Sequence, residues 1–223
     1  MKMEWTGMYQ TVIFDLDGTL LDTLDDLTAS VNFALASFSL PVRTREEVRG
    51  FVGNGIVNLM QRAIGYKHPK FEEIFQAFRQ HYGEHCKDKT KEYDGITPLL
   101  KALKTQGVQT AVVSNKADFA VKALAKEYFP NLLEEAVGEN EAAGFAKKPA
   151  PDALLAVMKK LNAERETTVY VGDSEVDIQT AENAGVDCIS VVWGFKDEAF
   201  LKANGAKTLV SKPEEILEQC KER

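Results

Sequence analysis

The stretch TVIFDLDGT, residues 11–19, joins an apolar run to two carboxylates on a short turn. The run TVIF predicts a buried strand, which places Asp15 and Asp17 directly beyond its carboxyl end. Ligands of parallel sheets bind at that edge, and Gly18 lets the backbone turn away there. Two neighbouring carboxylates repel each other unless a cation or a proton offsets their charge. The stretch therefore predicts a reactive or cation-binding acid pair; the alternative is an Asp-Gly turn with a capping aspartate.

Three further apolar runs, at 109–114, 167–173 and 187–192, predict more buried strands. Continuous apolar runs, rather than strict alternation, are typical of parallel strands that helices cover on both faces. Helical patterns lie between these runs in the sequence. The alternation predicts an α/β fold, with a doubly wound parallel sheet of the Rossmann-like kind.

Residues 23–93 interrupt that alternation, because this segment has helical periodicity and no convincing strand. We expect residues 1–22 and 94–223 to form the α/β core and residues 23–93 to form an inserted helical cap domain. The helices expected in the cap cover 23–38, 45–52, 55–64 and 69–88, and one at 97–106 resumes the core. Two crossings between the domains permit a hinge, so the cap could act as a lid.

The composition excludes several classes of partner. The chain of 223 residues carries 34 acidic and 27 basic residues, and this net charge of -7 argues against a nucleic-acid partner. No apolar stretch approaches the roughly 18 residues of a membrane span, and we expect no membrane partner. Three widely spaced cysteines indicate neither a disulfide framework nor a zinc site, which favours a cytoplasmic location.

Polar signals also follow the other predicted strands, in a fixed order along the chain. Ser114 ends the run AVV, Lys148 lies in KKPAPD, and Asp173 and Asp177 lie in GDSEVD. Each signal alone is weak, since a capping aspartate or a solvated lysine gives the same letters. Together with VIFDLDGTLLDT, however, they resemble the four motifs of the haloacid dehalogenase-like hydrolases, in the phosphotransferase form of that superfamily.

The resemblance implies a role for each residue. Asp15 is implied as the nucleophile that forms a phospho-aspartate, and Asp17 as the general acid and then the base. Family members that cleave carbon–halogen bonds lack this second aspartate, so Asp17 favours phosphoryl transfer. Ser114 is implied to hydrogen-bond a phosphoryl oxygen, and Lys148 to offset the charge that develops during transfer.

A magnesium ion is implied as the cofactor, because Mg²⁺ takes oxygen ligands. The resemblance gives its ligands as Asp15, the backbone carbonyl of Asp17, and Asp173. Asp177 lies one helical turn beyond Asp173, and we expect it to accept a hydrogen bond from a metal-bound water or to orient Lys148.

The inserted segment is implied to set substrate specificity. Residues 49–65, RGFVGNGIVNLMQRAIG, resemble the cap of phosphoglycolate phosphatase-like members, and VVWGF (191–195) resembles the loop after their last core strand. Gly53 and Asn54 could present backbone N–H groups to an anion, although a helix-to-helix turn explains them equally well. Asn115 is a further candidate substrate contact through its backbone N–H. Surface solvation is the favoured interpretation for three more candidates, Arg49, Arg62 and Lys116.

The predicted function is a Mg²⁺-dependent phosphatase that acts on a small phosphorylated metabolite. Phosphoglycolate, a sugar phosphate, a nucleotide and pyrophosphate all remain open as substrates. A sugar-phosphate mutase is one alternative, but it needs an acid/base in the cap soon after the first motif. The cap histidines, His68, His81 and His85, lie late in the segment. A catalytically silent regulatory protein is the other alternative, although no motif residue is missing. The sequence says nothing of oligomeric state.

Overall fold

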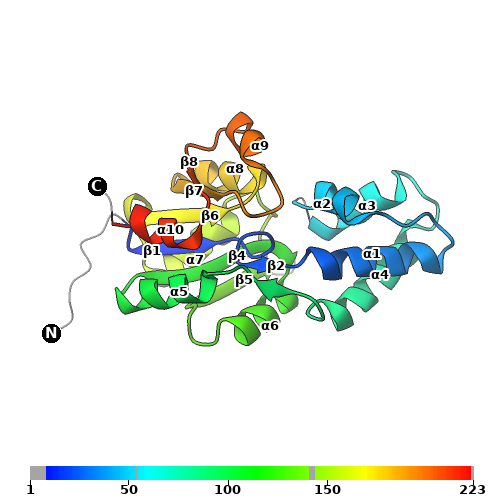
Figure 1. Cartoon of the computed structure of the whole chain (residues 1–223), viewed down its shortest axis with the longest axis horizontal. Coiled ribbons are helices and arrows are strands. Elements are labelled where there is room, and N and C mark those ends of the chain that lie inside the picture. Colours follow the sequence, from blue (N-terminus) through cyan, green and yellow to red (C-terminus); the bar gives the residue numbers. More distant parts are fainter. Residues whose placement is uncertain (1–8, 54, 141–143, 222–223) are drawn as a thin grey trace. The chain divides into compact units, whose positions relative to one another are not determined.

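The computed structural model describes residues 9–53, 55–140 and 144–221. The chain forms two compact units. Figure 1 shows the chain coloured from its N-terminus to its C-terminus. One comprises Met1–Leu20 with Glu92–Arg223, and the other comprises Leu21–Lys91. The boundaries expected from the sequence lie two residues further along the chain at each junction.

The first unit contains a six-stranded sheet in the order β5-β4-β1-β6-β7-β8. Every neighbouring pair is parallel, and Thr11 of the central β1 lies opposite Gln109 on one side and Thr168 on the other. The strands are β1 (Thr11–Phe14), β4 (Gln109–Ala117), β5 (Glu135–Glu139), β6 (Thr168–Gly172), β7 (Asp187–Val191) and β8 (Thr208–Val210). The predicted doubly wound parallel sheet is confirmed, and the four predicted strands are β1, β4, β6 and β7.

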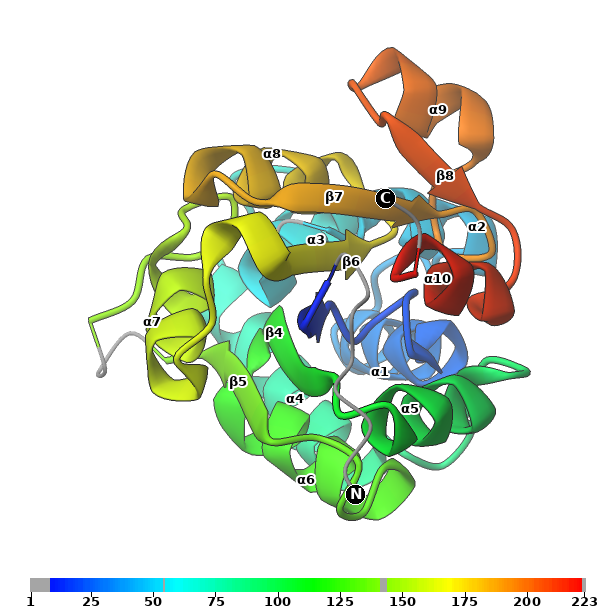
Figure 2. The ribbon, with the colours of Figure 1, turned by 90° about the vertical axis from the view of Figure 1, so that its left-hand side faces the viewer.

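Helices cover both faces of this sheet (Figure 2). They are α5 (Ile96–Thr105), α6 (Asp118–Tyr128), α7 (Asp152–Leu161), α8 (Glu175–Ala184), α9 (Glu198–Ala203) and α10 (Pro213–Gln219), with a short 3₁₀ helix at Arg165–Thr167. Helices α7 and α8 pack on one face, where Leu154 and Ala181 join Ile13 and Tyr170 in a buried cluster. Helices α5 and α10 lie on the other face. Because helices cover both faces of the sheet, polar side chains that could bind a ligand are expected at the carboxyl ends of its strands.

The second unit is helical, as the sequence predicts. Its helices are α1 (Leu24–Ser37), α2 (Arg45–Phe51), α3 (Gly55–Ile64) and α4 (Phe71–His85). The short strands β2 (Leu21–Asp22) and β3 (Lys91–Glu92) pair with each other where the chain enters and leaves this unit. Helix α4 buries Ile74, Phe78 and Tyr82, and α1 packs against it. Its aromatic stripe therefore serves packing.

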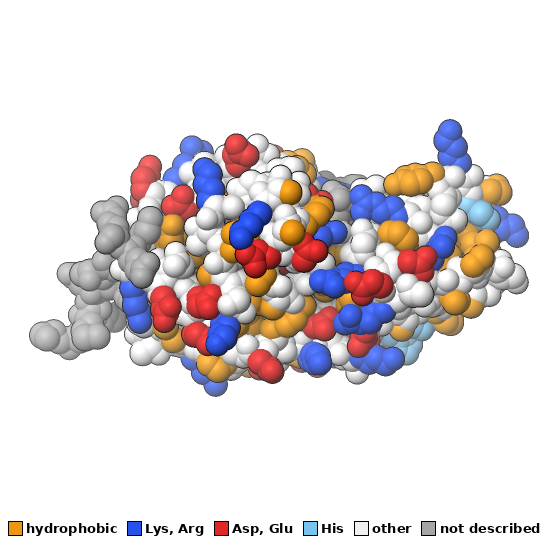
Figure 3. Space-filling model, turned by 45° about the horizontal axis from the view of Figure 1, so that its top comes forward, with side chains coloured by type: hydrophobic (Ala, Val, Ile, Leu, Met, Phe, Trp, Pro, Cys, Tyr) orange, Lys and Arg blue, Asp and Glu red, His pale blue; other side chains and the backbone are white. Residues whose placement is uncertain are grey.

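Among the residues that the structure describes, no helix is long and apolar enough to cross a membrane. Figure 3 shows basic and acidic side chains interspersed on one face of the molecule. The absence of a nucleic-acid partner stays a prediction from the net charge.

Candidate active site

Asp15 stands where β1 ends, at the carboxyl edge of the sheet. Its backbone N–H donates to the carbonyl of Val171 at 2.8 Å, which continues the parallel ladder one residue beyond the strand. The residue is 8% exposed, and its Oδ1 lies 3.1 Å from Nζ of Lys148. That contact lacks hydrogen-bond geometry, and Oδ1 accepts no hydrogen bond from any described residue. A buried carboxylate oxygen with this surrounding is available for a ligand or for reaction.

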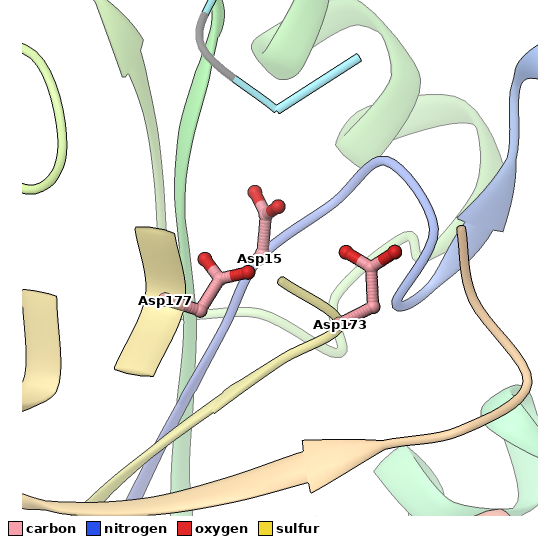
Figure 4. A group of neighbouring side chains, drawn as sticks. All are labelled: Asp15, Asp173 and Asp177. Atoms are coloured by element: carbon pink, nitrogen blue, oxygen red, sulfur yellow. The ribbon is translucent and has the colours of Figure 1, made fainter. Parts of the chain in front are cut away.

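Two more aspartates converge on Asp15, as Figure 4 shows. Asp173 directly follows β6, and Asp177 lies in the first turn of α8. One carboxylate oxygen of each of the three residues lies within 4.8 Å of the others, and all three residues are buried. The Oδ2 of Asp173 accepts a hydrogen bond from the backbone N–H of Phe195 at 2.6 Å. The two strand ends and the helix start thus bring three acids together.

Asp177 is already bound at both oxygens. Its Oδ1 lies 2.7 Å from Nζ of Lys148, and its Oδ2 accepts from the backbone N–H and the hydroxyl of Ser174 at 3.0 and 2.6 Å. These contacts fix the start of α8 and aim the carboxylate at the lysine. They support the expected orienting of Lys148 more than direct ligation of a metal.

Lys148 is held at both its backbone and its ammonium group. The Asn115 side chain accepts from its N–H at 2.8 Å and donates to its carbonyl at 3.0 Å. Its Nζ also donates to the hydroxyl of Tyr170 at 2.9 Å, and that hydroxyl donates to the carbonyl of Val113. Burial alone would lower the pKa of Lys148, but Asp15 and Asp177 outweigh it and raise the pKa well above its ordinary value. The ammonium is therefore a fixed positive charge beside Asp15.

Burial shifts the pKa values of two of these acids. Desolvation, with repulsion from Asp177 and Asp17, raises the pKa of Asp15 from 3.8 to about 6 even though Lys148 lowers it. Desolvation, with repulsion from Asp177 and Asp15, raises the pKa of Asp173 well above its ordinary value. Among the residues that the structure describes, the four carboxylates and two buried lysines gathered here carry a formal charge of -2 when all are ionised. A divalent cation with a preference for oxygen fits this donor set.

Lys116 differs from its sequence-based interpretation, and the expectation of surface solvation is wrong. The residue is 4% exposed, and its Nζ lies 3.0 and 3.3 Å from the two carboxylate oxygens of Asp17. A lysine is rarely buried unless a partner carries the opposite charge, and Asp17 supplies that charge. This contact could not be predicted from the sequence, because the two residues are 99 positions apart.

The remaining candidate substrate contacts lie on β4 and in the helical unit. Ser114 is buried on β4, with its hydroxyl 3.4 Å from the backbone N–H of Lys116. Gly53 lies in the helical unit and has a φ of 124°, which favours glycine, whereas Asn54 lies outside the described residues. Arg49 pairs with Glu46 at 3.1 Å, and Arg62 donates to the carbonyl of Phe51 at 2.9 Å. Roles for these residues toward a substrate stay predictions.

Two glycines leave the space that Asp173 occupies. A Cβ at Gly18, whose φ is 83°, would lie 2.4 Å from Oδ2 of Asp173. A Cβ at Gly194 would lie 2.4 Å from both Cβ of Asp173 and the carbonyl oxygen of Gly18. The indole N–H of Trp193 donates to the carbonyl of Thr19 at 3.0 Å and holds the two loops together. Asp173 thus sits in a cradle that any larger residue would fill.

Gly194→Ala is expected to displace Asp173 and to destabilise the fold by about 1–3 kcal/mol, because backbone atoms cannot give way cheaply. Thermal unfolding with and without added Mg²⁺ measures the effect. Gly83→Ala, in helix α4, is the matched control, since a Cβ there meets nothing within 4 Å. It should leave stability unchanged or raise it by about 0.5–1 kcal/mol. Equal unfolding temperatures for Gly194→Ala and the parent chain would contradict the cradle.

Comparison with known proteins agrees with this geometry. A family model described as haloacid dehalogenase-like hydrolase matches residues 12–191. Phosphoglycolate phosphatase 1 of Pseudomonas aeruginosa is 36% identical over 198 residues, which cover 85% of this chain and 72% of that protein. Phosphoglycolate phosphatase of Pseudomonas putida is 32% identical over 217 residues, with 94% and 79% covered. The crystal structure of a candidate phosphoglycolate phosphatase from Lactobacillus delbrueckii subsp. bulgaricus has a TM-score of 0.90 at 35% identity and covers 97% of this chain and 100% of its own.

The chain belongs to the haloacid dehalogenase-like hydrolase family, so the resemblance seen in its motifs is confirmed. Its named relatives are phosphatases, and the predicted enzyme class, a phosphoric monoester hydrolase, is confirmed with it.

Proposed function

We propose that this enzyme is a Mg²⁺-dependent phosphatase that hydrolyses small phosphate monoesters through a phosphorylated Asp15. The observation that carries the proposal is the buried Asp15 carboxylate, which has an oxygen without a hydrogen bond from the described residues and a fixed ammonium 3.1 Å away. Phosphoglycolate is the first substrate we would test, because the relatives quoted above are named for it.

The reaction divides into two displacements at phosphorus. Asp15 attacks the phosphoryl group, the bond to the ester oxygen breaks, and Asp17 gives that oxygen a proton. Asp17 then takes a proton from a water molecule, whose oxygen attacks the phosphorus of the acyl phosphate. This second step releases inorganic phosphate and restores the Asp15 carboxylate. One difficult hydrolysis thereby becomes two easier steps.

The neighbours of Asp15 supply positioning and charge. Lys148, fixed by Asp177 and Tyr170, offsets the negative charge that gathers on the phosphoryl oxygens during both displacements. The hydroxyl of Ser114 and the backbone N–H of Asn115 are assigned to the phosphoryl oxygens in this proposal. The Asn115 side chain acts indirectly, because both of its polar atoms bind the backbone of Lys148.

Asp15, Asp173 and the backbone carbonyl of Asp17 are the proposed ligands of the magnesium ion. When bound, Mg²⁺ withdraws negative charge from the phosphoryl group and from the clustered carboxylates. Its fit is supported by the surplus of carboxylates over lysines in the site and by the raised pKa of Asp173.

We assign substrate selection to residues 23–93, with Gly53 and Asn54 as candidate contacts. Replacing this segment is expected to change which esters are accepted, while the residues that surround Asp15 stay in place. A cytoplasmic location belongs to the same proposal, and it is supported by the three cysteines, which are thiols rather than disulfides.

Release of inorganic phosphate from a panel of small esters tests the function. Phosphoglycolate, a sugar phosphate, a nucleotide and pyrophosphate are compared with Mg²⁺ and with a chelator. We expect phosphate release to depend on Mg²⁺ and to fall by at least about 10²-fold in the chelator. Without the metal, the negative charge of the phosphoryl group and of the clustered carboxylates is no longer offset. Isomerised sugar phosphate without free phosphate would support a mutase instead. No turnover of any ester would support a silent binding protein.

A further inference from the structure

Helix α4 carries two histidines, His81 and His85, one helical turn apart. Residues at positions i and i+4 lie on one face of a helix, where their side chains are neighbours. The two imidazole rings do lie together, with their centroids 4.4 Å apart and their planes tilted by 32°. The proposed phosphatase reaction uses neither ring. Two histidines at this spacing are the zinc ligands of the helical H-E-x-x-H motif, so the pair is suited to binding a metal ion.

Each ring is held through its Nδ1 atom. Nδ1 of His81 lies 2.9 Å from the hydroxyl oxygen of Ser30 on α1, and Nδ1 of His85 lies 2.7 Å from a carboxylate oxygen of Asp88. Within the described part of the chain, no residue hydrogen-bonds to the Nε2 atom of either ring. In a metal-binding histidine, one ring nitrogen typically donates to an oxygen and the other binds the ion. Both rings have a partner of the right kind at Nδ1.

The surroundings of His81 favour the form of the ring that binds a metal. Its partner Ser30 is fully buried, and the ring of Phe33 stacks on it with centroids 4.2 Å apart. Desolvation, with repulsion from His85, lowers the pKa of His81 below its ordinary value. A metal ion binds the neutral imidazole, so a lowered pKa reduces the competition from protons. The ring is therefore both oriented and kept neutral.

The partner of His85 is also fixed in place. Asp88 directly precedes Lys89 and Thr90, whose backbone N–H groups donate to the carboxylate of Asp26 on α1 at 3.0 and 2.8 Å. Asp26 is itself buried, so these contacts anchor the segment after α4 to the helical unit. An ionised carboxylate only accepts hydrogen bonds, so a neutral His85 carries its proton at Nδ1 and has its lone pair at Nε2.

We propose that His81 and His85 form a binding site for a divalent transition-metal ion of the Zn²⁺ kind, with Nε2 of each ring as a ligand and water completing the coordination. Imidazole nitrogen suits Zn²⁺, whereas Mg²⁺ prefers oxygen ligands. The site belongs to the helical unit and uses none of the three aspartates that converge in the core.

The separation of the rings is compatible with a shared ion. Zinc lies about 2.0–2.1 Å from a histidine nitrogen, and tetrahedral geometry then puts the centroids of two ligand rings about 5 Å apart. The 4.4 Å between His81 and His85 is shorter than this by less than about 1 Å, a difference that small rotations of the two side chains remove. No movement of the helix is needed.

Calorimetric titration of the full chain with ZnCl₂ tests the site, with Mg²⁺ in excess to compete for the aspartates of the core. We expect one Zn²⁺ to bind each chain. Asp88→Asn, which removes only the partner of His85, should weaken binding by about 10-fold. His81→Gln and His85→Gln remove a ligand, and each should weaken binding by about 100-fold or more.

His68→Gln is the matched control, because His68 precedes α4 and its Nδ1 accepts from the backbone N–H of Lys70. This variant should bind Zn²⁺ as the parent chain does, and so should Asp15→Asn. Since the chain has three histidines, NMR of the imidazole nitrogens distinguishes them. Zn²⁺ should shift the signals of His81 and His85, with Nε2 as the bound nitrogen, and leave those of His68 in place.

Three results would overturn the inference. The first is a wild-type chain that binds no Zn²⁺. The second is binding that survives in His81→Gln and His85→Gln but is lost in Asp15→Asn, since the ion would then lie among the acids of the core. The third is an equal shift of all three histidines, which would indicate non-specific binding.

Discussion

Asp15→Asn is expected to abolish phosphate release, with a loss of at least about 10⁴-fold in kcat, in line with the removal of nucleophiles in other enzymes. An amide is a poor nucleophile, and the substitution hardly changes the shape of the side chain. Steady-state phosphate release on the best ester of the panel measures the loss. Turnover near the wild-type rate would contradict the assignment of Asp15.

The same substitution should stabilise the metal-free protein, which separates lost chemistry from lost folding. The folded state raises the pKa of Asp15 from 3.8 to about 6, chiefly through desolvation. Between these values the unfolded carboxyl loses its proton and the folded one keeps it, so the stability of the wild-type protein falls as pH rises. Asparagine avoids this loss. Above pH 6 the variant should therefore gain roughly 2–3 kcal/mol in the presence of a chelator, and the gain should vanish below pH about 4.

Lys148→Ala is expected to lower kcat by roughly 10²-fold or more, because it removes a charge that is fixed beside Asp15 before reaction begins. It should also destabilise the fold by about 3–5 kcal/mol, since Asp177 is left buried without its ion pair. Kinetics and denaturant unfolding measure the two effects on the same preparation.

Lys147→Ala provides the control for that substitution. Lys147 is the preceding residue, is partly exposed, and pairs with Glu139 at 2.7 Å. Its loss should leave kcat unchanged and should alter the free energy of unfolding by no more than about 0.5 kcal/mol, as is usual for surface positions. If both lysine variants lose the same activity, the effect of Lys148 is not one of local charge.

The sheet was largely predictable because its central strands are continuous apolar runs. The strand β5 was missed, since EAVGE contains two glutamates and a glycine and has only a short apolar centre. The strand β8 was missed because three residues are too few for a pattern. Both lie at the edges of the sheet, where burial constrains the sequence least.

The order of the motifs predicted which acids meet at the sheet edge, but it could not give their partners. The sequence alone predicts Lys116 to be a surface lysine, whereas in the folded chain it is buried against Asp17. The sequence predicts Tyr170 to be a core residue of a strand. Only the structure shows that its hydroxyl accepts a hydrogen bond from Nζ of Lys148. Such long-range pairings leave no local signal in one sequence. The resemblance of VVWGF to a family loop drew attention to the segment that contains Gly194. Only the structure shows that Gly194 lies against Asp173.

The central claim is that Asp15 becomes phosphorylated, and substitution alone cannot separate a nucleophile from a metal ligand. Rapid acid quench during turnover, followed by mass spectrometry of the peptides, tests the claim directly. We predict a phosphoryl group on the peptide that contains Asp15, with Mg²⁺ present, and none in Asp15→Asn. Steady turnover with no phosphorylated peptide, or with the phosphoryl group on another residue, would contradict the mechanism.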